Sequence, residues 1–309
     1  MNKKGERRAS SSGYHFLNLY QNCAWKFFLK YVARLIPVYK DSALIQGGAV
    51  HEGISTFFKT RSKVKSINKV VSEIADQATL IESTQEYERI LHKAPILLDY
   101  WIALLGNRYL ADYTLISSER ELRLKIPNTP NFVYTVRPDA VISPKGHPST
   151  VYILEFKTSS SSWRTTEMGV RFGDQSTGYM WAVSSSLKLK VSGVLPNILY
   201  WNKKSDSETN IEIIESDIVE RTRKDIEEFK AGLAMLTSEV TQKVKSFQSG
   251  KFPAYMLFPR NTYYCNSYFR PCEYANICRL SLSMKGRAPQ GFKRDTYSKA
   301  VTITSPTEL

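Results

Sequence analysis

The sequence predicts an α/β fold, because helical and extended segments alternate along the chain. Apolar and polar residues alternate with the period of a strand over residues 119–126 and 132–136. A third extended run at 151–158 is followed by a helical segment at 173–186 and another extended run at 191–201. A strand–helix–strand order predicts a right-handed crossover and a parallel strand pair.

The other long segments are predicted to be helical. Residues 14–35 and 46–60 form two helices in this interpretation, and residues 67–112 look helical throughout, as part of a helical insertion at about 60–115. A long amphipathic helix is expected over residues 217–247. Its apolar residues recur at spacings of three and four, as on a core-facing stripe: Ile226, Phe229, Leu233, Leu236, Val240, Val244 and Phe247.

Chain length and composition bound the domain organisation. With 309 residues the chain can bury a sizeable core, and we predict one domain over residues 13–280. Residues 1–12 are basic and rich in serine and are expected to be disordered. Residues 281–309 are basic, contain few apolar residues and are expected to form a flexible tail. No run approaches the roughly twenty apolar residues that cross a membrane, so no membrane partner is expected.

The net charge of +14 predicts an anionic partner, for which nucleic acid is the first candidate. Basic residues are spread through the chain and are not gathered on one amphipathic helix, which disfavours a membrane-surface role. The chain also has 18 Tyr, 14 Phe and 5 Trp. Bases of a single strand can stack on such rings, although most of them are expected in the core.

Two acids and a lysine stand at the ends of two extended runs. Asp139 follows Arg137 and Pro138, and Glu155 and Lys157 end the next run, with a turn predicted at Pro144–Pro148. Strand alternation puts Glu155 and Lys157 on one face. Two charges on one face of a buried strand are costly unless something pairs with them. A divalent metal and a phosphate would pair with these two charges. The alternative is that Glu155 and Lys157 form a surface ion pair on an edge strand.

These residue types suit phosphodiester hydrolysis. The reaction needs a hard cation to polarise the phosphoryl oxygen and to lower the pKa of the attacking water. Asp139 and Glu155 offer the oxygen ligands that Mg²⁺ and Mn²⁺ prefer. Lys157 can hold the water and offset charge on the phosphate.

Together the residues resemble the motifs of the PD-(D/E)XK nuclease superfamily. Pro138-Asp139 matches the Pro-Asp pair of the motif, and Glu155-Phe156-Lys157 matches its (D/E)XK triplet. The RecB-like branch adds a Gln-x-x-x-Tyr motif on the next helix, which Gln175 and Tyr179 match, one helical turn apart. It also carries a Gly-x-x-His-Glu motif on an early helix. His51 occupies that position, where a lone histidine is otherwise more often structural.

The resemblance implies a restriction-endonuclease-like core, with a mixed central sheet flanked by helices, and a divalent metal site. His51, Asp139, Glu155 and the main-chain carbonyl of Phe156 would bind one or two Mg²⁺ or Mn²⁺ ions, and Lys157 would position the hydrolytic water. Gln175 and Tyr179 would brace Lys157 or contact a phosphate. In some relatives a further acid approaches the metals; Glu119 and Glu121 are the candidates here, and neither is included in the predicted site.

The four cysteines predict an iron–sulfur cluster, because four thiolates commonly hold one and none is left over. They also resemble a branch with one cysteine before the nuclease core and three after it, as in the CRISPR adaptation nuclease and the AddB nuclease domain. That branch implies a [4Fe–4S] cluster that clamps the N-terminal helix to the segment 260–280. The cysteines are Cys23, Cys265, Cys272 and Cys278.

One departure keeps other cysteine chemistry open. Six residues separate Cys265 from Cys272, whereas the branch has two at this place, and a tetrahedral zinc site would also take four thiolates. Two disulfides are a further alternative. Nothing like a secretory signal precedes Cys23, so we expect a reducing, cytoplasmic location, which disfavours disulfides.

The resemblance implies a DNA exonuclease that acts on single-stranded DNA or on DNA ends. An accessory or non-catalytic DNA-binding subunit of a recombination, repair or CRISPR-adaptation complex is the alternative. Relatives work beside integrases or helicases, so such a partner protein is expected. The chain has no helicase-type phosphate loop of its own. The helical region at 60–115 would arch over the active site in the resembled family, but its pattern also suits a plain packed subdomain.

Overall fold

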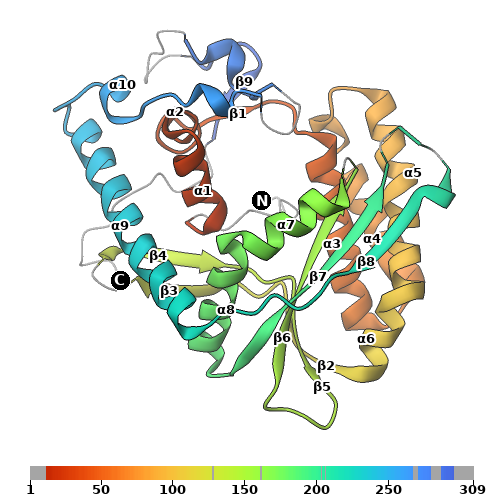
Figure 1. Cartoon of the computed structure of the whole chain (residues 1–309). Helices are drawn as coiled ribbons and strands as arrows, with labels where there is room; N and C mark the ends of the chain where they lie inside the picture. The colour runs from red at the N-terminus through yellow and green to blue at the C-terminus, as the bar shows by residue number, and fades with distance from the viewer. Residues whose placement is uncertain are drawn as a thin grey trace, which may run out of the picture. The chain divides into compact units, whose positions relative to one another are not determined.

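The structure is a computed structural model, and it describes residues 12–126, 129–160, 162–202, 204–205, 207–266, 271–279 and 287–295. The chain forms two compact units (Figure 1). The described part of unit 1 comprises Tyr39–Leu122 and Val136–Glu227. The described part of unit 2 comprises residues 12–38, 123–126, 129–135, 228–266, 271–279 and 287–295.

Unit 1 is built on a five-stranded mixed sheet with the strand order β2-β5-β6-β7-β8. Strand β5 is antiparallel to both β2 and β6, β6 and β7 run parallel, and β8 is antiparallel to β7. The predicted α/β class and the predicted parallel pair are therefore confirmed. The strands are β2 (Tyr113–Ser118), β5 (Ala140–Pro144), β6 (Val151–Ser159), β7 (Val191–Trp201) and β8 (Ile211–Glu215).

One face of this sheet is covered by the helices that precede it in the chain (Figure 1). Leu154 and Phe156 of β6 point into their apolar core. Both predicted helical regions are confirmed, and breaks occur where Ser62 and Ser83 cap new helices with their side chains. The elements are α3 (Ser42–Thr60), α4 (Lys63–Ala75), η2 (Ala78–Leu80), α5 (Thr84–Trp101), η3 (Ile102–Gly106) and α6 (Asn107–Asp112).

The opposite face is covered by α7 (Trp163–Phe172) and α8 (Asp174–Leu187). Glu155 and Lys157 alternate with the core residues of β6 and lie on this face, where both contact α8. The predicted common face of Glu155 and Lys157 and the predicted helix over residues 173–186, here α8, are therefore confirmed. Helix α7 was not predicted, because a serine-rich stretch precedes it and its mixed composition gives little periodic signal.

Unit 2 shows that the helix expected over residues 14–35 is interrupted. Cys23 has an extended backbone between α1 (Tyr14–Asn22) and α2 (Ala24–Phe27), and its Sγ accepts the Lys26 N–H at 3.5 Å. The π-helical turn η1 (Phe28–Val32) and strand β1 (Leu35–Pro37) follow. A thiol is not a usual helix cap, so residue type gave no sign of the break.

The strands β3 (Leu122–Ile126) and β4 (Thr129–Val136) form a two-stranded sheet of their own, separate from the sheet that contains β6. One further sequence prediction needs correction. The long helix α9 (Arg223–Gln248) begins six residues later than expected. Three further short helical elements belong to unit 2: α10 (Ala254–Leu257), η5 (Thr262–Tyr264) and η7 (Ala275–Ile277). The short helix η4 (Glu208–Asn210) belongs to unit 1.

Part of the C-terminal segment expected to be flexible is a strand. Residues Phe292–Arg294 form β9, which pairs antiparallel with β1. Tyr274 also holds β1 in place, because its hydroxyl donates to the carbonyl oxygen of Leu35 in that strand at 2.8 Å. The predictions for residues 1–11, 281–286 and 296–309 concern residues outside the described ranges.

Candidate active site

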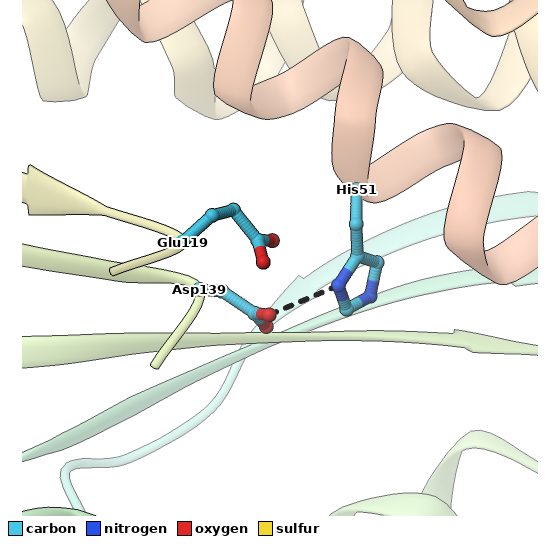
Figure 2. Close-up of side chains that lie close together, drawn as sticks. All are labelled: His51, Glu119 and Asp139. Carbon is cyan, nitrogen blue, oxygen red and sulfur yellow. Dashed lines mark hydrogen bonds and ion pairs between the residues drawn. The ribbon is translucent and has the colours of Figure 1, made fainter. Parts of the chain in front are cut away.

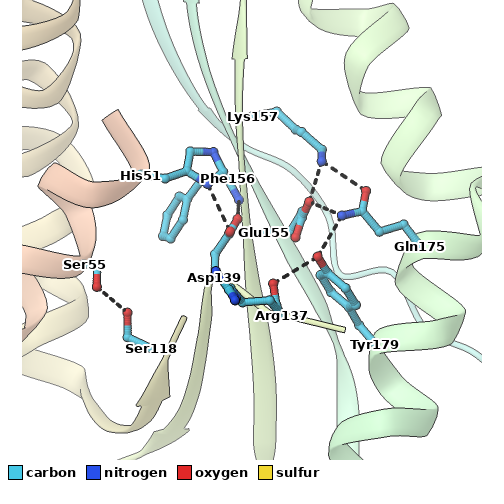
Figure 3. A network of polar contacts seen from close by, with 10 residues as sticks. All are labelled: His51, Ser55, Ser118, Arg137, Asp139, Glu155, Phe156, Lys157, Gln175 and Tyr179. Atoms are coloured by element: carbon cyan, nitrogen blue, oxygen red, sulfur yellow. Dashed lines mark hydrogen bonds and ion pairs between the residues drawn. The ribbon is translucent and has the colours of Figure 1, made fainter. Parts of the chain in front are cut away.

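Asp139 stands directly before β5 and is bound from two sides (Figure 3). Its Oδ1 lies 3.0 Å from Nδ1 of His51 on α3, and its Oδ2 accepts the Phe156 N–H of β6 at 2.7 Å. The Phe156 ring is buried and meets the His51 ring edge-on. These contacts place His51 and Asp139, which are 88 positions apart, on one side of the site.

Glu119 joins these two residues and was left out of the predicted site. One ligand atom each from His51, Glu119 and Asp139 all lie within 4.8 Å of one another (Figure 2). The Glu119 N–H donates to the Asp139 carbonyl oxygen at 3.1 Å, and its φ of +54° is uncommon for a residue other than glycine. The other candidate acid, Glu121, instead pairs with Arg137 at 3.3 Å.

Glu155, Lys157 and two residues of α8 form one hydrogen-bonded chain (Figure 3). Lys157 Nζ lies 2.5 Å from Glu155 Oε1 and donates to Gln175 Oε1 at 3.1 Å. Gln175 Nε2 donates to Glu155 Oε1 at 3.0 Å and to the Tyr179 hydroxyl at 2.9 Å. The Tyr179 hydroxyl in turn donates to the Arg137 carbonyl oxygen at 3.1 Å. The α8 residues thus contact both charged residues of β6.

Burial and neighbouring charges give the two acids different proton affinities. Burial is the largest influence on Glu155 and raises its pKa to about 7; Lys157 opposes this and Asp139 adds to it. Burial also raises the pKa of Asp139, but His51, Lys157 and the Phe156 N–H outweigh it and hold that pKa below its ordinary value. Near neutral pH, Asp139 is therefore ionised while Glu155 is partly protonated.

The donor set fits a divalent cation. Glu155 Oε2 is buried and accepts no hydrogen bond from any residue that the structure describes. A buried carboxylate oxygen without a partner is unfavourable unless a cation or donor satisfies it. Carboxylate oxygens with one imidazole suit Mg²⁺, Mn²⁺ and similar ions. The Phe156 carbonyl, the remaining predicted ligand, stays a prediction.

The cysteine segments meet within unit 2, but the described thiols are not gathered as closely as a single metal ion requires. The Cys272 N–H donates to the Cys265 carbonyl oxygen at 2.7 Å, and the Trp25 ring N–H donates to the Cys278 carbonyl oxygen at 3.0 Å. Burial raises the pKa of the Cys272 thiol, and the charge of Glu273 adds to it. Among the described residues, which include all four cysteines, no three thiols come within 4.8 Å of one another.

The comparisons with known proteins agree with the site. The family model of the PD-(D/E)XK nuclease superfamily matches residues 14–279, so the chain belongs to this superfamily. The comparison with curated proteins gave no match. Membership supports phosphodiester hydrolysis with a divalent metal, and the mixed sheet with its flanking helices fits a restriction-endonuclease-like core.

Two solved structures are similar at low sequence identity. SSO0001 shares 16% identity with a TM-score of 0.33, over 76% of this chain and 85% of its own. LHK-Exo in complex with dAMP shares 11% identity with a TM-score of 0.29, over 66% of this chain and 96% of its own. Separately, none of the helices in the described ranges is both long and apolar enough to cross a membrane.

Proposed function

We propose that this chain is a DNA exonuclease that depends on Mg²⁺ or Mn²⁺ and hydrolyses single-stranded DNA or DNA ends. The observation that carries the proposal is the convergence of His51, Glu119 and Asp139, together with the buried, unpartnered oxygen of Glu155 on β6, the strand that pairs with β5. The net charge of +14 supports a polyanionic substrate. Contacts to phosphates carry no sequence information, so the proposed nuclease has low base specificity.

The ion would be held by His51, Glu119, Asp139 and Glu155, with the main-chain carbonyl of Phe156. When bound, it supplies polarisation of the phosphoryl oxygen and a lower pKa for the attacking water. Asp139 is ionised at neutral pH and so is ready to coordinate. Glu155 loses its proton on binding, because a ligand carboxyl must be deprotonated.

Lys157 would orient the attacking water and offset the charge of the phosphate. Its ammonium group contacts Glu155 Oε1 and Gln175 Oε1, and these two contacts hold it in place on the face of β6 that carries Glu155. This arrangement supports a positioned lysine at the reacting phosphate.

Gln175 and Tyr179 would act by fixing Lys157. Because the Tyr179 hydroxyl donates to the Arg137 carbonyl oxygen, its oxygen accepts from Gln175 Nε2. That contact determines which end of the Gln175 amide faces Lys157, namely the oxygen. The hydrogen bonds favour bracing of Lys157 over direct contact with a phosphate.

We further propose a [4Fe–4S] cluster on Cys23, Cys265, Cys272 and Cys278, with zinc as the alternative. The hydrogen bonds between Trp25 and Cys278, and between Cys272 and Cys265, support it, because they bring the N- and C-terminal cysteine segments together. A cluster there would fasten α1 and α2 to the segment 260–280 within unit 2.

The nuclease is tested with end-labelled single- and double-stranded DNA, with Mn²⁺, with Mg²⁺ and with chelator. We expect metal-dependent degradation that Glu155→Ala abolishes, and a product ladder that reveals the polarity. Glu119→Gln should lower the rate by about 100-fold or more, whereas Glu121→Gln, an acid two positions away, should change it little. A folded protein that binds DNA without cutting it, or cuts only with an integrase or helicase partner, would instead favour the accessory subunit.

A further inference from the structure

Helix α7 connects two parts of the active site. It follows β6, which carries Glu155 and Lys157, and Gly173 alone separates it from α8, which carries Gln175. Phe172 is three positions before Gln175, so their Cα atoms lie at most about 11 Å apart. At 3.4 Å per nucleotide of one strand, this distance corresponds to about three nucleotides or fewer.

One face of α7 is exposed and carries no charged residue. The helix buries Val170, while Met168 is 58% and Phe172 is 73% exposed. Thr165, Met168, Gly169 and Phe172 have the spacing of a single helix face and are called the α7 stripe below. A Cβ at Gly169 would meet nothing within 4 Å, so the middle of the α7 stripe is open. Exposed apolar side chains grouped in this way mark binding surfaces more often than isolated ones do.

The α7 stripe is held rigidly with respect to the active site. Ser162 caps the first turn by accepting the Thr165 N–H at 3.2 Å. At the other end, Ser176 of α8 donates to the Val170 carbonyl oxygen at 2.7 Å, and Arg221 donates to the Arg171 carbonyl oxygen at 2.6 Å. Both ends of α7 are therefore anchored, and only Gly173 and Asp174 stand between Phe172 and Gln175 in the sequence.

We propose that the α7 stripe is the surface on which bases of the bound DNA strand stack, with Phe172 as the principal stacking residue. This inference rests on the proposed nuclease function and assigns it a base-contacting surface. The hydroxyl, thioether and phenyl groups of the stripe cannot neutralise a phosphate, but a phenyl ring matches the face of any base. Stacking of this kind tolerates any sequence, as a nuclease of low base specificity requires.

Charge and position favour DNA over a protein as the occupant. The stripe ends at Phe172, three positions before the Gln175 that contacts Lys157, and the whole chain carries +14. At the N-terminal end of α7 the guanidinium of exposed Arg164 lies 4.6 Å over the Trp163 ring. Arginine planes and aromatic rings are both surfaces on which unpaired bases stack.

The test measures binding of a fluorescein-labelled twelve-nucleotide oligothymidine by anisotropy, with the full chain in chelator so that no cleavage occurs. Phe172→Ala should weaken binding by about 5- to 150-fold, the loss expected for one base–aromatic stack. Phe172→Trp should retain affinity. Leu104→Ala and Met235→Ala, which remove apolar side chains that are 59% and 76% exposed elsewhere, should change affinity little. Thermal unfolding should be unchanged in all four, since no buried group is lost.

An abasic scan separates stacking from an indirect effect. When each nucleotide in turn is replaced by an abasic one, the parent should lose affinity at one or two positions. Phe172→Ala should show no further loss at those same positions, because the stacking partner is already absent. Equal losses in parent and variant at every position would overturn the proposal.

Other outcomes are distinguishable. If Phe172→Ala binds DNA as tightly as Leu104→Ala does, and the parent still cleaves DNA, the stacking surface is overturned and the nuclease proposal stands. If DNA binding depends on Phe172 but the parent protein does not cleave DNA, the stacking surface is supported and the proposed nuclease function is wrong. If sedimentation shows that Phe172→Ala dissociates an oligomer and DNA affinity is unchanged, the stripe seats a second copy of the chain and the proposal is wrong.

Discussion

Ser55 and Ser118 share a hydrogen bond of 2.9 Å between their hydroxyl oxygens, and each is a close neighbour of a candidate metal ligand (Figure 3). Ser55 lies one helical turn beyond His51 on α3, and Ser118 immediately precedes Glu119. Ser55 is 3% exposed. The hydrogen bond therefore fixes the position of helix α3 relative to the end of β2, and hence the separation of His51 and Glu119.

Ser55→Ala should weaken Mn²⁺ binding by about 10- to 100-fold, the usual cost of losing a group that orients metal ligands. The measurement is calorimetric titration of the chelator-treated protein. Ser184→Ala is the matched control, because it removes a hydroxyl that donates to Leu189 at the C-terminal end of α8. Equal Mn²⁺ affinity in the two variants would show that the Ser55 contact does not orient the ligands.

Substitutions along the Lys157 chain should reduce the cleavage rate in a graded order. Lys157→Ala removes the group at the phosphate and should cost about 10³-fold in kcat, and Gln175→Ala, which leaves Lys157 less well positioned, about 10²-fold. Tyr179→Phe removes one hydroxyl and should cost about 10-fold. Steady-state kinetics gives the order, and DNA affinity in chelator should stay nearly constant. A larger loss for Tyr179→Phe than for Gln175→Ala contradicts the bracing role.

Glu155→Gln should stabilise the metal-free protein at pH 8 by about 1–3 kcal/mol and have little effect at pH 5. The folded pKa of about 7 exceeds the unfolded value of about 4.3, so the folded state binds more protons between them. The free energy of unfolding therefore falls as pH rises through this window and stays lower above pH 7. The uncharged amide removes that loss. Urea unfolding at both pH values measures it, and parallel parent and variant curves would contradict it.

The anaerobically purified protein should contain about four irons and four sulfides per chain, with none in Cys272→Ala. That variant should also lower the thermal stability of unit 2, because two distant chain segments lose a common attachment. Iron and sulfide assays with absorption spectra make the measurement. If the assays find stoichiometric zinc and no sulfide, the four cysteines form a zinc site and not a cluster. A stable, fully active Cys272→Ala variant would contradict the proposed clamp.

Much of the catalytic sheet could be predicted from local pattern. The alternation in β6 placed Glu155 and Lys157 on one face, and the strand–helix–strand order gave the parallel pairing of β6 with β7. Both depend on short stretches of sequence whose own periodicity determines the result. Strands β2 and β8 gave a weaker signal, because both lie at the edges of the sheet and bury few of their residues.

Other features depend on contacts that local sequence does not encode. The choice of Glu119 over Glu121 depends on a left-handed backbone conformation, which glutamate does not signal. The break of the first helix depends on the Cys23 thiol acting as a cap. Strand β9 forms because β1, more than 250 positions earlier, provides its partner, and nothing near Phe292–Arg294 in the sequence indicates this.

The pairing of β1 with β9 also bears on how the chain folds during synthesis. Strand β1 is among the first elements to be synthesised, yet its partner is added only when almost the entire chain has been translated. Contacts so distant in sequence form slowly. The last segment of unit 1 ends at Glu227, and this unit contains all the proposed metal ligands. Because compact units of a chain generally fold as units during synthesis, we expect the metal-site residues to assemble before β9 pairs with β1.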